Sequence, residues 1–389
     1  MQSNPVLART FAPPVMEARR WLDGVSFPPE RALLNLSQAA PVAPPPPPLL
    51  AAMGAALADP ATHLYGPVLG LPELRARLAQ RMSQIYAGHV ADSQVAITSG
   101  CNQAFCAAIT ALAGPGDSVI LPVPWYFNHA MWLTMQGIEA APLPCGDALL
   151  PDPDHAARLI TPRTRALVLV TPNNPTGTEY PPALIAAFRD LARKRGIALI
   201  IDETYRDFHS QDGPPHTLFA DPDWDDTLIH LYSFSKAYRL TGHRVGAMAA
   251  SPTILAQVEK FLDTVTICPT ALGQRAALWG LDNLSDWLAG ERAEILRRRA
   301  ALTQGFATLD GWRLRACGAY FAYVAHPFQT PSDQLAPQLV REAGLLALPG
   351  TMFAPEDDTQ GARHLRIAFA NADIAGLAEL TERLRRLDR

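Results

Sequence analysis

The stretch RALVLVTPNNPTGTEYPPALIAAFRDLARKRGIALIIDETY, residues 165–205, decides the fold class. Two apolar, β-rich runs at 165–170 and 197–202 flank a segment at 183–196 whose apolar residues recur with helical spacing. Both runs are apolar at nearly every position, as expected of parallel strands covered by helices on both faces. Gly196 suits the left-handed end of a helix. The stretch therefore predicts a strand-helix-strand unit of an α/β protein.

The same pattern continues on both sides of this unit. We expect further strands at 94–98, 118–123, 228–233 and 246–251, and another helix at 102–114 that also ends in glycine. The five prolines at 44–48 favour an extended linker, because proline fixes φ and lacks the N–H donor.

From about residue 285 the pattern changes to that of a second, α+β domain. The expected order there is a helix at 291–306, β-rich sequence at 311–326 and a closing helix at 373–389. We therefore predict an α/β protein with a mostly parallel sheet covered by helices on both faces, plus a smaller α+β domain. The expected parts are an N-terminal segment of the small domain, a large domain and a C-terminal small domain, at 1–45, 46–285 and 286–389.

Composition excludes several classes of function. Of 389 residues, 48% are apolar and 18% charged, which fits a globular enzyme rather than a disordered chain. A net charge of -4 provides no basic field for nucleic acid, and no apolar run is long enough for a membrane helix. The N-terminus lacks a signal-peptide pattern, so we expect a cytoplasmic protein. Neither the cysteines nor the histidines show metal-ligand spacing, so no metal is expected.

Polar residues follow four of the predicted strands, where ligands bind in open parallel sheets. The turn at Ser99 to Asn102 is either an ordinary turn or an anion site at a helix N-terminus, and Asn174 suits a turn for steric reasons alone. Asp202 closes an apolar strand, where burial requires a cationic partner unless it caps a helix. Lys236 poses the same problem, and burial favours a depressed pKa and a nucleophilic role.

A cofactor with a phosphate, a protonatable ring nitrogen and an aldehyde satisfies all these groups, and pyridoxal 5′-phosphate has the three. The chain resembles the fold-type I pyridoxal phosphate enzymes, specifically the class I/II aminotransferases and their kynurenine and glutamine transaminase-like branch. The motifs that carry the resemblance occur in the family's order along nearly the whole chain: NLSQAAP at 35–41, LYGPVLGLPELR at 64–75, TSGCNQA at 98–104, PWY at 124–126, TPNNPTG at 171–177, IIDETY at 200–205, SFSKAYRLTGHRVG at 233–246 and HLRIAFA at 364–370.

The resemblance implies a role for each polar residue near the cofactor. Lys236 would form the internal aldimine and then move the proton between substrate and cofactor. Asp202 would keep the ring nitrogen protonated, and Tyr205 and Asn174 would hydrogen-bond the phenolic oxygen. The phosphate would be held by side chains and backbone N–H groups of Ser233, Ser235, Arg244, Gly100, Cys101 and Asn102. Arg239 is expected to point elsewhere.

The resemblance also implies a substrate site and a partner subunit. Tyr126 would stack on the ring, with Trp125 as the competing candidate. Arg366 would hold the substrate α-carboxylate in a bidentate fork, beside Asn174 and Ala39, whose methyl group departs from the usual glycine. Tyr65 would reach the phosphate of a neighbouring subunit, which implies a homodimer.

The leading hypothesis is an aminotransferase that moves an amino group from an L-amino acid to a 2-oxo acid by ping-pong chemistry. The aromatic residues of GAYFAYV at 318–324, together with Trp21, favour a neutral or aromatic substrate, although such residues are more often core. A carbon-sulfur β-lyase at the same site is the alternative. A ligand-sensing transcription regulator is less favoured, because the segment before NLSQAAP leaves no room for a helix-turn-helix.

Overall fold

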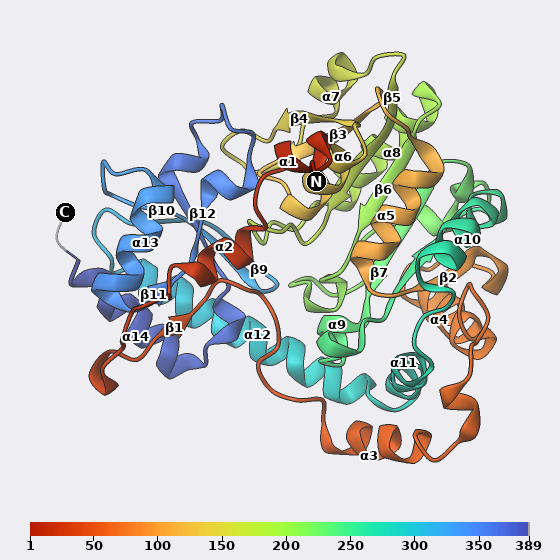
Figure 1. Cartoon of the computed structure of the whole chain (residues 1–389), viewed down its shortest axis with the longest axis horizontal. Coiled ribbons are helices and arrows are strands. Elements are labelled where there is room, and N and C mark those ends of the chain that lie inside the picture. Colours follow the sequence, from red (N-terminus) through yellow and green to blue (C-terminus); the bar gives the residue numbers. More distant parts are fainter. Residues whose placement is uncertain (388–389) are drawn as a thin grey trace.

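The computed structural model of the chain describes residues 1–387, which form two domains side by side (Figure 1). In this range the sheet of the large domain has seven strands in the order β2-β8-β7-β6-β5-β3-β4, and β8 runs antiparallel to its neighbours β2 and β7. The other pairs are parallel, so the predicted mostly parallel α/β sheet is confirmed. The strands are β2 Val95–Thr98, β3 Ser118–Val123, β4 Glu139–Pro144, β5 Thr164–Val170, β6 Ala198–Asp202, β7 Leu228–Ser233 and β8 Gly246–Ala249.

Alternate residues of each central strand enter different hydrophobic cores, as the pleat requires. In β6, Leu199 and Ile201 join one core while Ile200 joins the other. One face is covered by α5 Cys101–Leu112, α6 Phe127–Met135 and α10 Pro252–Thr266. The opposite face is covered by α3 Pro47–Ala56, α4 Pro72–Ile85, α7 Pro153–Leu159, α8 Pro182–Arg195 and α11 Ala271–Asn283.

The small domain is built around an antiparallel sheet in the order β12-β13-β10-β9. Its strands are β9 Arg313–Gly318, β10 Phe321–Ala325, β12 Leu348–Pro349 and β13 His364–Ile367, and its helices are α12 Ser285–Phe306, α13 Ser332–Ala343 and α14 Ile374–Arg385. The N-terminal segment joins this domain, because β1 Leu34–Asn35 pairs in parallel with β11 Leu345–Leu346.

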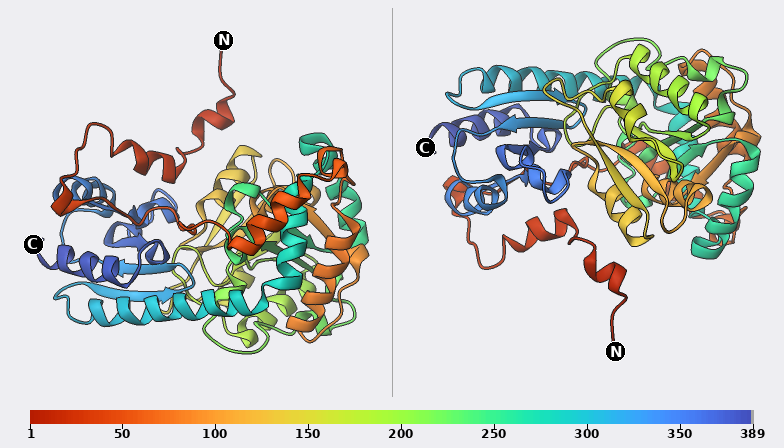
Figure 2. Two further views of the ribbon diagram at one scale, coloured as in Figure 1. Left: turned by 90° about the horizontal axis from the view of Figure 1, so that it is seen from below. Right: turned by 90° about the horizontal axis from the view of Figure 1, so that it is seen from above.

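Two short helices precede β1. The first, α1 Pro5–Arg9, lies beside α6, and the chain before it extends outward to the N-terminus (Figure 2), whereas α2 Pro14–Arg20 lies near β12. After β1 the chain crosses to the large domain and enters α3. The predicted extended linker at 44–48 is therefore only partly right: Pro47 and Pro48 begin α3, where the missing N–H of proline breaks no helical hydrogen bond.

Several predicted boundaries differ from the structure. The helix expected at 102–114 ends at Leu112 with an extended Ala113, so a glycine does not cap it, whereas Gly196 does adopt the left-handed conformation after α8. Strand β4 was not predicted, because its proline-containing edge sequence EAAPLP lacks an apolar run. The predicted closing helix covers α14, and its last two residues, 388–389, lie outside the described range. Within residues 1–387, no helix is both long and apolar enough to cross a membrane.

Candidate active site

A cavity of about 500 Å³ opens where the large-domain strands end at their carboxyl edge, and residues of the small domain and the N-terminal segment close it. Its walls contain Pro13, Pro14, Val15, Met16, Arg19, Gln38, Ala39, Ala40, Cys101, Asn102, Tyr126, Phe127, Asn128, Val170, Asn174, Asp202, Thr204, Tyr205, Ser233, Ser235, Lys236, Thr241, Arg244 and Arg366. The structure thus brings together most of the site residues that the sequence predicts.

Lys236 lies in a single helical turn, α9 Phe234–Ala237, directly after β7. The Ser233 hydroxyl caps this turn by accepting from the Ser235 N–H at 3.2 Å. The Lys236 ammonium nitrogen donates to the Ala39 carbonyl oxygen at 2.7 Å. Burial, followed by the charges of Arg244 and Arg366, lowers the pKa of Lys236 to about 7. A large fraction of the amine is therefore neutral and nucleophilic near neutral pH.

This lowered pKa predicts the reactivity of Lys236 in the cofactor-free protein. Only the neutral amine attacks an electrophile, so the rate of acetylation by acetic anhydride should rise through pH 7 and reach a plateau well below pH 10. Mass spectrometry of the peptide containing Lys236 measures this rate at each pH. The exposed Lys260, which donates to Gln257, is the internal reference in the same samples. A midpoint near pH 10 for Lys236 would contradict the prediction.

Asp202 ends β6 and points its carboxylate into the cavity from a nearly fully buried position. The Thr204 N–H donates to its Oδ1 at 3.0 Å, and His129 Nε2 lies 3.4 Å from its Oδ2. Burial acts to raise the pKa of Asp202, but His129 and Thr204 outweigh it and the pKa is lowered. The side chain is therefore an anion, available to a cationic group in the cavity.

His129 was missed by the sequence reasoning. It lies in α6, where its ring stacks on Phe105 at 3.8 Å between centroids and meets Tyr126 edge-on at 5.0 Å. These contacts hold the imidazole against Asp202. The sequence feature that could have indicated His129 is its position three residues after Tyr126, in the first turn of the helix that follows PWY.

An anion-binding corner lies on the other side of the cavity. Arg244 donates from Nη1 to the Ser235 hydroxyl at 3.3 Å and to the Thr241 carbonyl oxygen at 3.0 Å. Gly100 precedes α5 with φ +87°, and a Cβ there would lie 2.2 Å from Arg244 Nη2. Glycine is therefore needed for the guanidinium to approach the turn. The first N–H groups of α5 have no intrahelical acceptor, and they add partial positive charge to this corner.

Arg366 lies in β13 and reaches the cavity from the small domain. Its Nη1 donates to Asn174 Oδ1 at 3.1 Å, and its Nη2 donates to the Ser37 carbonyl oxygen. Among the described residues its buried Nε has no partner. Burial lowers the pKa of Arg366 to about 10, so the guanidinium stays charged at neutral pH. A buried cation with an unsatisfied donor beside a cavity fits a carboxylate ligand.

The tyrosines of the site differ in their surroundings. Tyr126 directly precedes α6 and lines the cavity, where its hydroxyl donates to Asn102 Oδ1 at 3.2 Å. Trp125 lines a separate, very small cavity, to which Tyr126 also contributes, and of the two only Tyr126 lines the main cavity. Tyr205 is buried against Phe321, with ring centroids 4.9 Å apart, and burial raises its pKa well above the usual value.

Two predicted features lie outside the cavity wall. Tyr65 is 81% exposed and is not among the residues that line the cavity of its own chain. The suggestion that Trp21 and the aromatics of 318–324 line a substrate pocket is wrong, because Trp21 packs on hydrophobic cores and Tyr320, Phe321 and Tyr323 are core residues. Both faces of β10 are covered, so these side chains are buried within the small domain. Phe321 contacts the site through the ring of Tyr205 and through a cation–π contact with Arg366.

The sequence reasoning also missed the N-terminal wall of the cavity. This wall consists of residues from the segment around α2: Pro13, Pro14, Val15, Met16 and Arg19. No local pattern in these residues predicts that they face a site built from residues hundreds of positions later. Figure 1 shows α2 lying across the region between the two domains.

A second buried cluster lies behind the sheet, where Glu203 turns away from the cavity. Its Oε2 accepts from Tyr86, lies 2.7 Å from His230 Nε2 and lies 3.5 Å from His216 Nε2. These groups are close enough to hold a metal ion. However, the Leu218 N–H donates to His216 Nδ1 at 3.2 Å, which places the proton of neutral His216 on Nε2. His216 is therefore arranged as a donor toward the carboxylate rather than as a metal ligand.

Comparison with known proteins agrees with this geometry. The sequence profile of the family described as Aminotransferase class I and II matches residues 31–384. The chain belongs to this family. It is 31% identical to a valine–pyruvate aminotransferase of Mycobacterium tuberculosis over 365 residues, which is 91% of this chain and 90% of the relative. It is 28% identical to an aromatic aminotransferase of Arabidopsis thaliana over 338 residues, 84% of this chain and 82% of the relative.

The fold comparison gives the same result for this aminotransferase. The solved structure of an aspartate aminotransferase from Thermus thermophilus with maleate superimposes with a TM-score of 0.89 at 26% identity, covering 99% of both chains. The protein is therefore a pyridoxal phosphate-dependent enzyme of fold type I, as the sequence motifs predicted.

The cavity of the aminotransferase has the donor set that this cofactor requires. Asp202 is a buried anion that would suit a protonated ring nitrogen, and Lys236 is an amine of lowered pKa that would suit the aldehyde. The corner of Arg244, Ser235 and the start of α5 has donors that would suit the phosphate. The close approach of Arg244 to Gly100 shows that this corner is built by the backbone as well as by side chains.

Proposed function

We propose that this aminotransferase takes the amino group from a neutral or aromatic L-amino acid and gives it to a 2-oxo acid in two half-reactions at one cavity. The observation that carries the proposal is the meeting of Lys236, Asp202 and Arg366 in that cavity. The bound cofactor supplies an electron sink for the electrons left at the substrate α-carbon. The remaining chemistry is that of the protein's own side chains.

Each of these side chains has a distinct task in the proposal. Lys236 is the amine that would hold the cofactor aldehyde, and its freed amine would carry the proton to and from the substrate α-carbon. The Ala39 carbonyl oxygen accepts from Lys236 Nζ at 2.7 Å, which supports a role in holding this amine during the proton transfer. Asp202, oriented by His129, stabilises the protonated ring nitrogen. Asn174 and Tyr205 hydrogen-bond the phenolic oxygen of the cofactor.

The phosphate and the ring face have their own residues in the proposal. Arg244, Ser233, Ser235 and the turn from Gly100 through Cys101 to Asn102 hold the phosphate. The ring of Tyr126 stacks on the cofactor, which its position in the cavity wall supports. Burial raises the pKa of the Cys101 thiol well above its usual value, so this residue contributes through its backbone rather than as a nucleophile.

The substrate preference follows from the rest of the cavity wall. Val15, Met16 and Phe127 add apolar surface, which supports a neutral or aromatic side chain. Several relatives are named for different substrates, including valine, arginine and aromatic amino acids. Family membership therefore does not fix the substrate, and the proposed preference for a neutral or aromatic side chain rests on the residues that line the cavity of this chain. Membership of the kynurenine and glutamine transaminase-like branch stays a prediction, as does the cytoplasmic location.

Stepwise addition of single amino acids to the cofactor-loaded enzyme tests this function. A neutral or aromatic amino acid should convert the absorption of the bound cofactor to the pyridoxamine form without any acceptor, and a 2-oxo acid should then reverse the change. Release of pyruvate and ammonia in the absence of an acceptor would instead show β-elimination. An absorption change with acidic amino acids alone would contradict the proposed substrate class.

Substitution of Arg366 by lysine should weaken substrate binding. Lysine keeps the charge but cannot form the bidentate fork with a carboxylate, and the buried donors that remain would be mismatched. We expect kcat/KM to fall by about 10²-fold, mainly through KM, as when one partner of a buried charge pair is altered. Steady-state kinetics measure this change. The control is Arg363→Lys, because Arg363 contacts the Phe328 carbonyl oxygen outside the cavity.

We further propose that the enzyme is a homodimer in which Tyr65 of each subunit completes the phosphate site of the other. The 81% exposure of Tyr65 and the exposed apolar side chains Leu64, Val265 and Ile267 support this assembly. Sedimentation velocity of the cofactor-loaded enzyme tests the proposal. A monomer that retains full activity would overturn it.

A further inference from the structure

Two segments of the chain join the large and small domains. The first is residues 36–46, here called the strap, which runs from β1 in the small domain to α3 in the large domain. The second is α12, which packs on α11 near its start and on α14 and β9 in the small domain. Any change in the angle between the domains must bend or move both segments.

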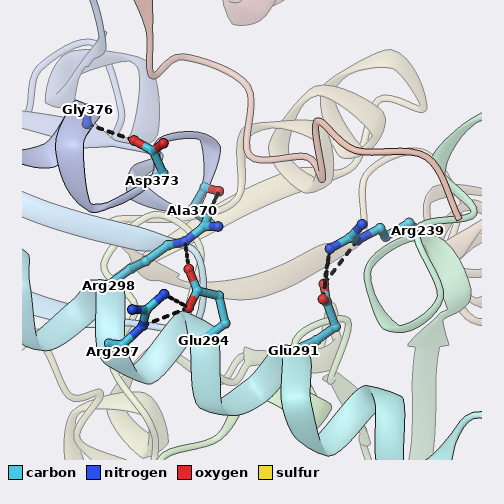
Figure 3. Close-up of polar contacts among 8 residues, drawn as sticks. All are labelled: Arg239, Glu291, Glu294, Arg297, Arg298, Ala370, Asp373 and Gly376. Carbon is cyan, nitrogen blue, oxygen red and sulfur yellow. Dashed lines mark hydrogen bonds and ion pairs between the residues drawn. The ribbon is translucent and has the colours of Figure 1, made fainter. Parts of the chain in front are cut away.

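The side chain of Arg239 contacts both connections at once. Its Nε donates to Glu291 Oε2 at 3.0 Å, and its Nη2 donates to Glu291 Oε1 at 2.8 Å. The guanidinium therefore forms a bidentate ion pair with this carboxylate of α12 (Figure 3). Its Nη1 donates to the Pro44 carbonyl oxygen of the strap at 3.2 Å. Its Cζ also lies 5.2 Å from the ring of Trp287, another residue of α12.

Arg239 belongs to the segment that carries two cofactor-binding groups, Lys236 and Arg244. Its backbone has φ +57°, a left-handed conformation that non-glycine residues adopt rarely and keep only when their surroundings hold them there. The ion pair with Glu291 supplies such a constraint, because both side chains are only 23% exposed and the geometry is bidentate. The strap also touches the site directly, since its Ala39 carbonyl oxygen accepts from Lys236.

We propose that Arg239 is a positioning residue that locks the angle between the domains and thereby sets the distance between Arg366 and Lys236. These two groups hold the same substrate from opposite domains, so the inference rests on the proposed function. Without the contacts of Arg239, part of the substrate's binding energy would be used to bring the two domains to the angle at which both can contact the substrate. Loss of Arg239 should therefore weaken substrate binding more than it slows the chemical step.

The test compares Arg239→Gln, Glu291→Gln and the double variant with the wild type, all loaded with cofactor. We expect the dissociation constant of α-methylphenylalanine, which has no α-hydrogen to lose, to rise by about fivefold in each single variant, while kcat falls by less than about twofold. The double variant should show no further loss, because both substitutions remove the same contact. Arg297→Gln is the matched control, since it breaks an ion pair with Glu294 on the same helix without reaching the strap (Figure 3).

Hydrogen exchange gives a second measurement that does not depend on turnover. Peptides covering residues 36–43 and 237–244 should exchange about fivefold faster in the Arg239→Gln variant and unchanged in Arg297→Gln. Equal exchange and equal ligand affinity in wild type and Arg239→Gln would overturn the proposal. If the wild type fails to bind α-methylphenylalanine, the proposed substrate class fails, and the exchange comparison alone decides the role of Arg239. Arg239→Lys, which keeps the charge, serves if Arg239→Gln does not fold.

Discussion

Replacement of Lys236 by alanine is expected to lower kcat by about 10⁴-fold, the upper range for a positioned acid-base group. The chain has lysine only at 194, 236 and 260, so no other lysine lies in the described cavity wall to take over the proton transfer. The variant should still bind the cofactor, because the phosphate corner and Asp202 are intact. Single-turnover absorption measurements with a good substrate determine the rate.

Two controls make this result specific to Lys236. Lys260→Ala removes an exposed lysine from α10 and should leave kcat unchanged. Borohydride reduction of the cofactor-loaded wild type, followed by peptide mapping, should add the cofactor mass at position 236 and nowhere else. An unmodified peptide at position 236, or full activity of the alanine variant, would show that Lys236 is not the bonded amine.

Replacement of Asp202 by asparagine is expected to have the second largest effect. Removing one partner of a buried ion pair costs about 3 to 5 kcal/mol, which corresponds to roughly 10²- to 10³-fold or more in kcat if it is lost in the transition state. The lowered pKa of Asp202 keeps the carboxylate ionised throughout the neutral range, so this loss should not depend on pH above about 5. Kinetics from pH 6 to pH 9 measure both points.

The neighbouring carboxylate provides a matched control for Asp202. Glu203→Gln alters the next side chain of the same chain segment, which faces the buried cluster of Tyr86, His216 and His230 instead of the cavity. We expect this variant to lower the melting temperature while leaving the turnover of the folded enzyme nearly unchanged. If Asp202→Asn and Glu203→Gln lose turnover equally, the effect of Asp202 is one of strand geometry rather than of charge.

Much of the large domain could be predicted from the sequence because its signals are local. Buried parallel strands require apolar residues on both faces, and the residues that follow them must lie at one edge of the sheet. Asp202, Asn174, Ser233 and Lys236 were found in this way, and the structure brings all four to one cavity. Strand β4 was missed because an edge strand needs no apolar run.

Local sequence patterns could not predict which side chains complete the site from a distance, and Arg366 and Ala39 were expected there only from the family resemblance. Lys236 meets Ala39 and Arg366 meets Asn174 across 197 and 192 positions of chain, and no local period encodes such pairs. The aromatic residues of 318–324 illustrate the opposite error, because composition indicated a pocket, whereas both faces of β10 are covered and these side chains are buried in the small domain. A Cβ on Gly177 would lie 2.4 Å from the backbone nitrogen of Gly318. This close approach also depends on how the two domains meet.

The sequence by itself determined the α/β class, the position of the site along the chain and the chemical character of its main groups. These follow from the spacing of apolar residues and from the few polar residues at strand ends. Only the tertiary structure decided which charges add to burial in lowering the pKa of Lys236, the support of Asp202 by His129, and the contacts of Arg239 with both interdomain segments. The physical reason is that burial and electrostatic interactions depend on distances in space, which are set by packing between segments far apart in the chain.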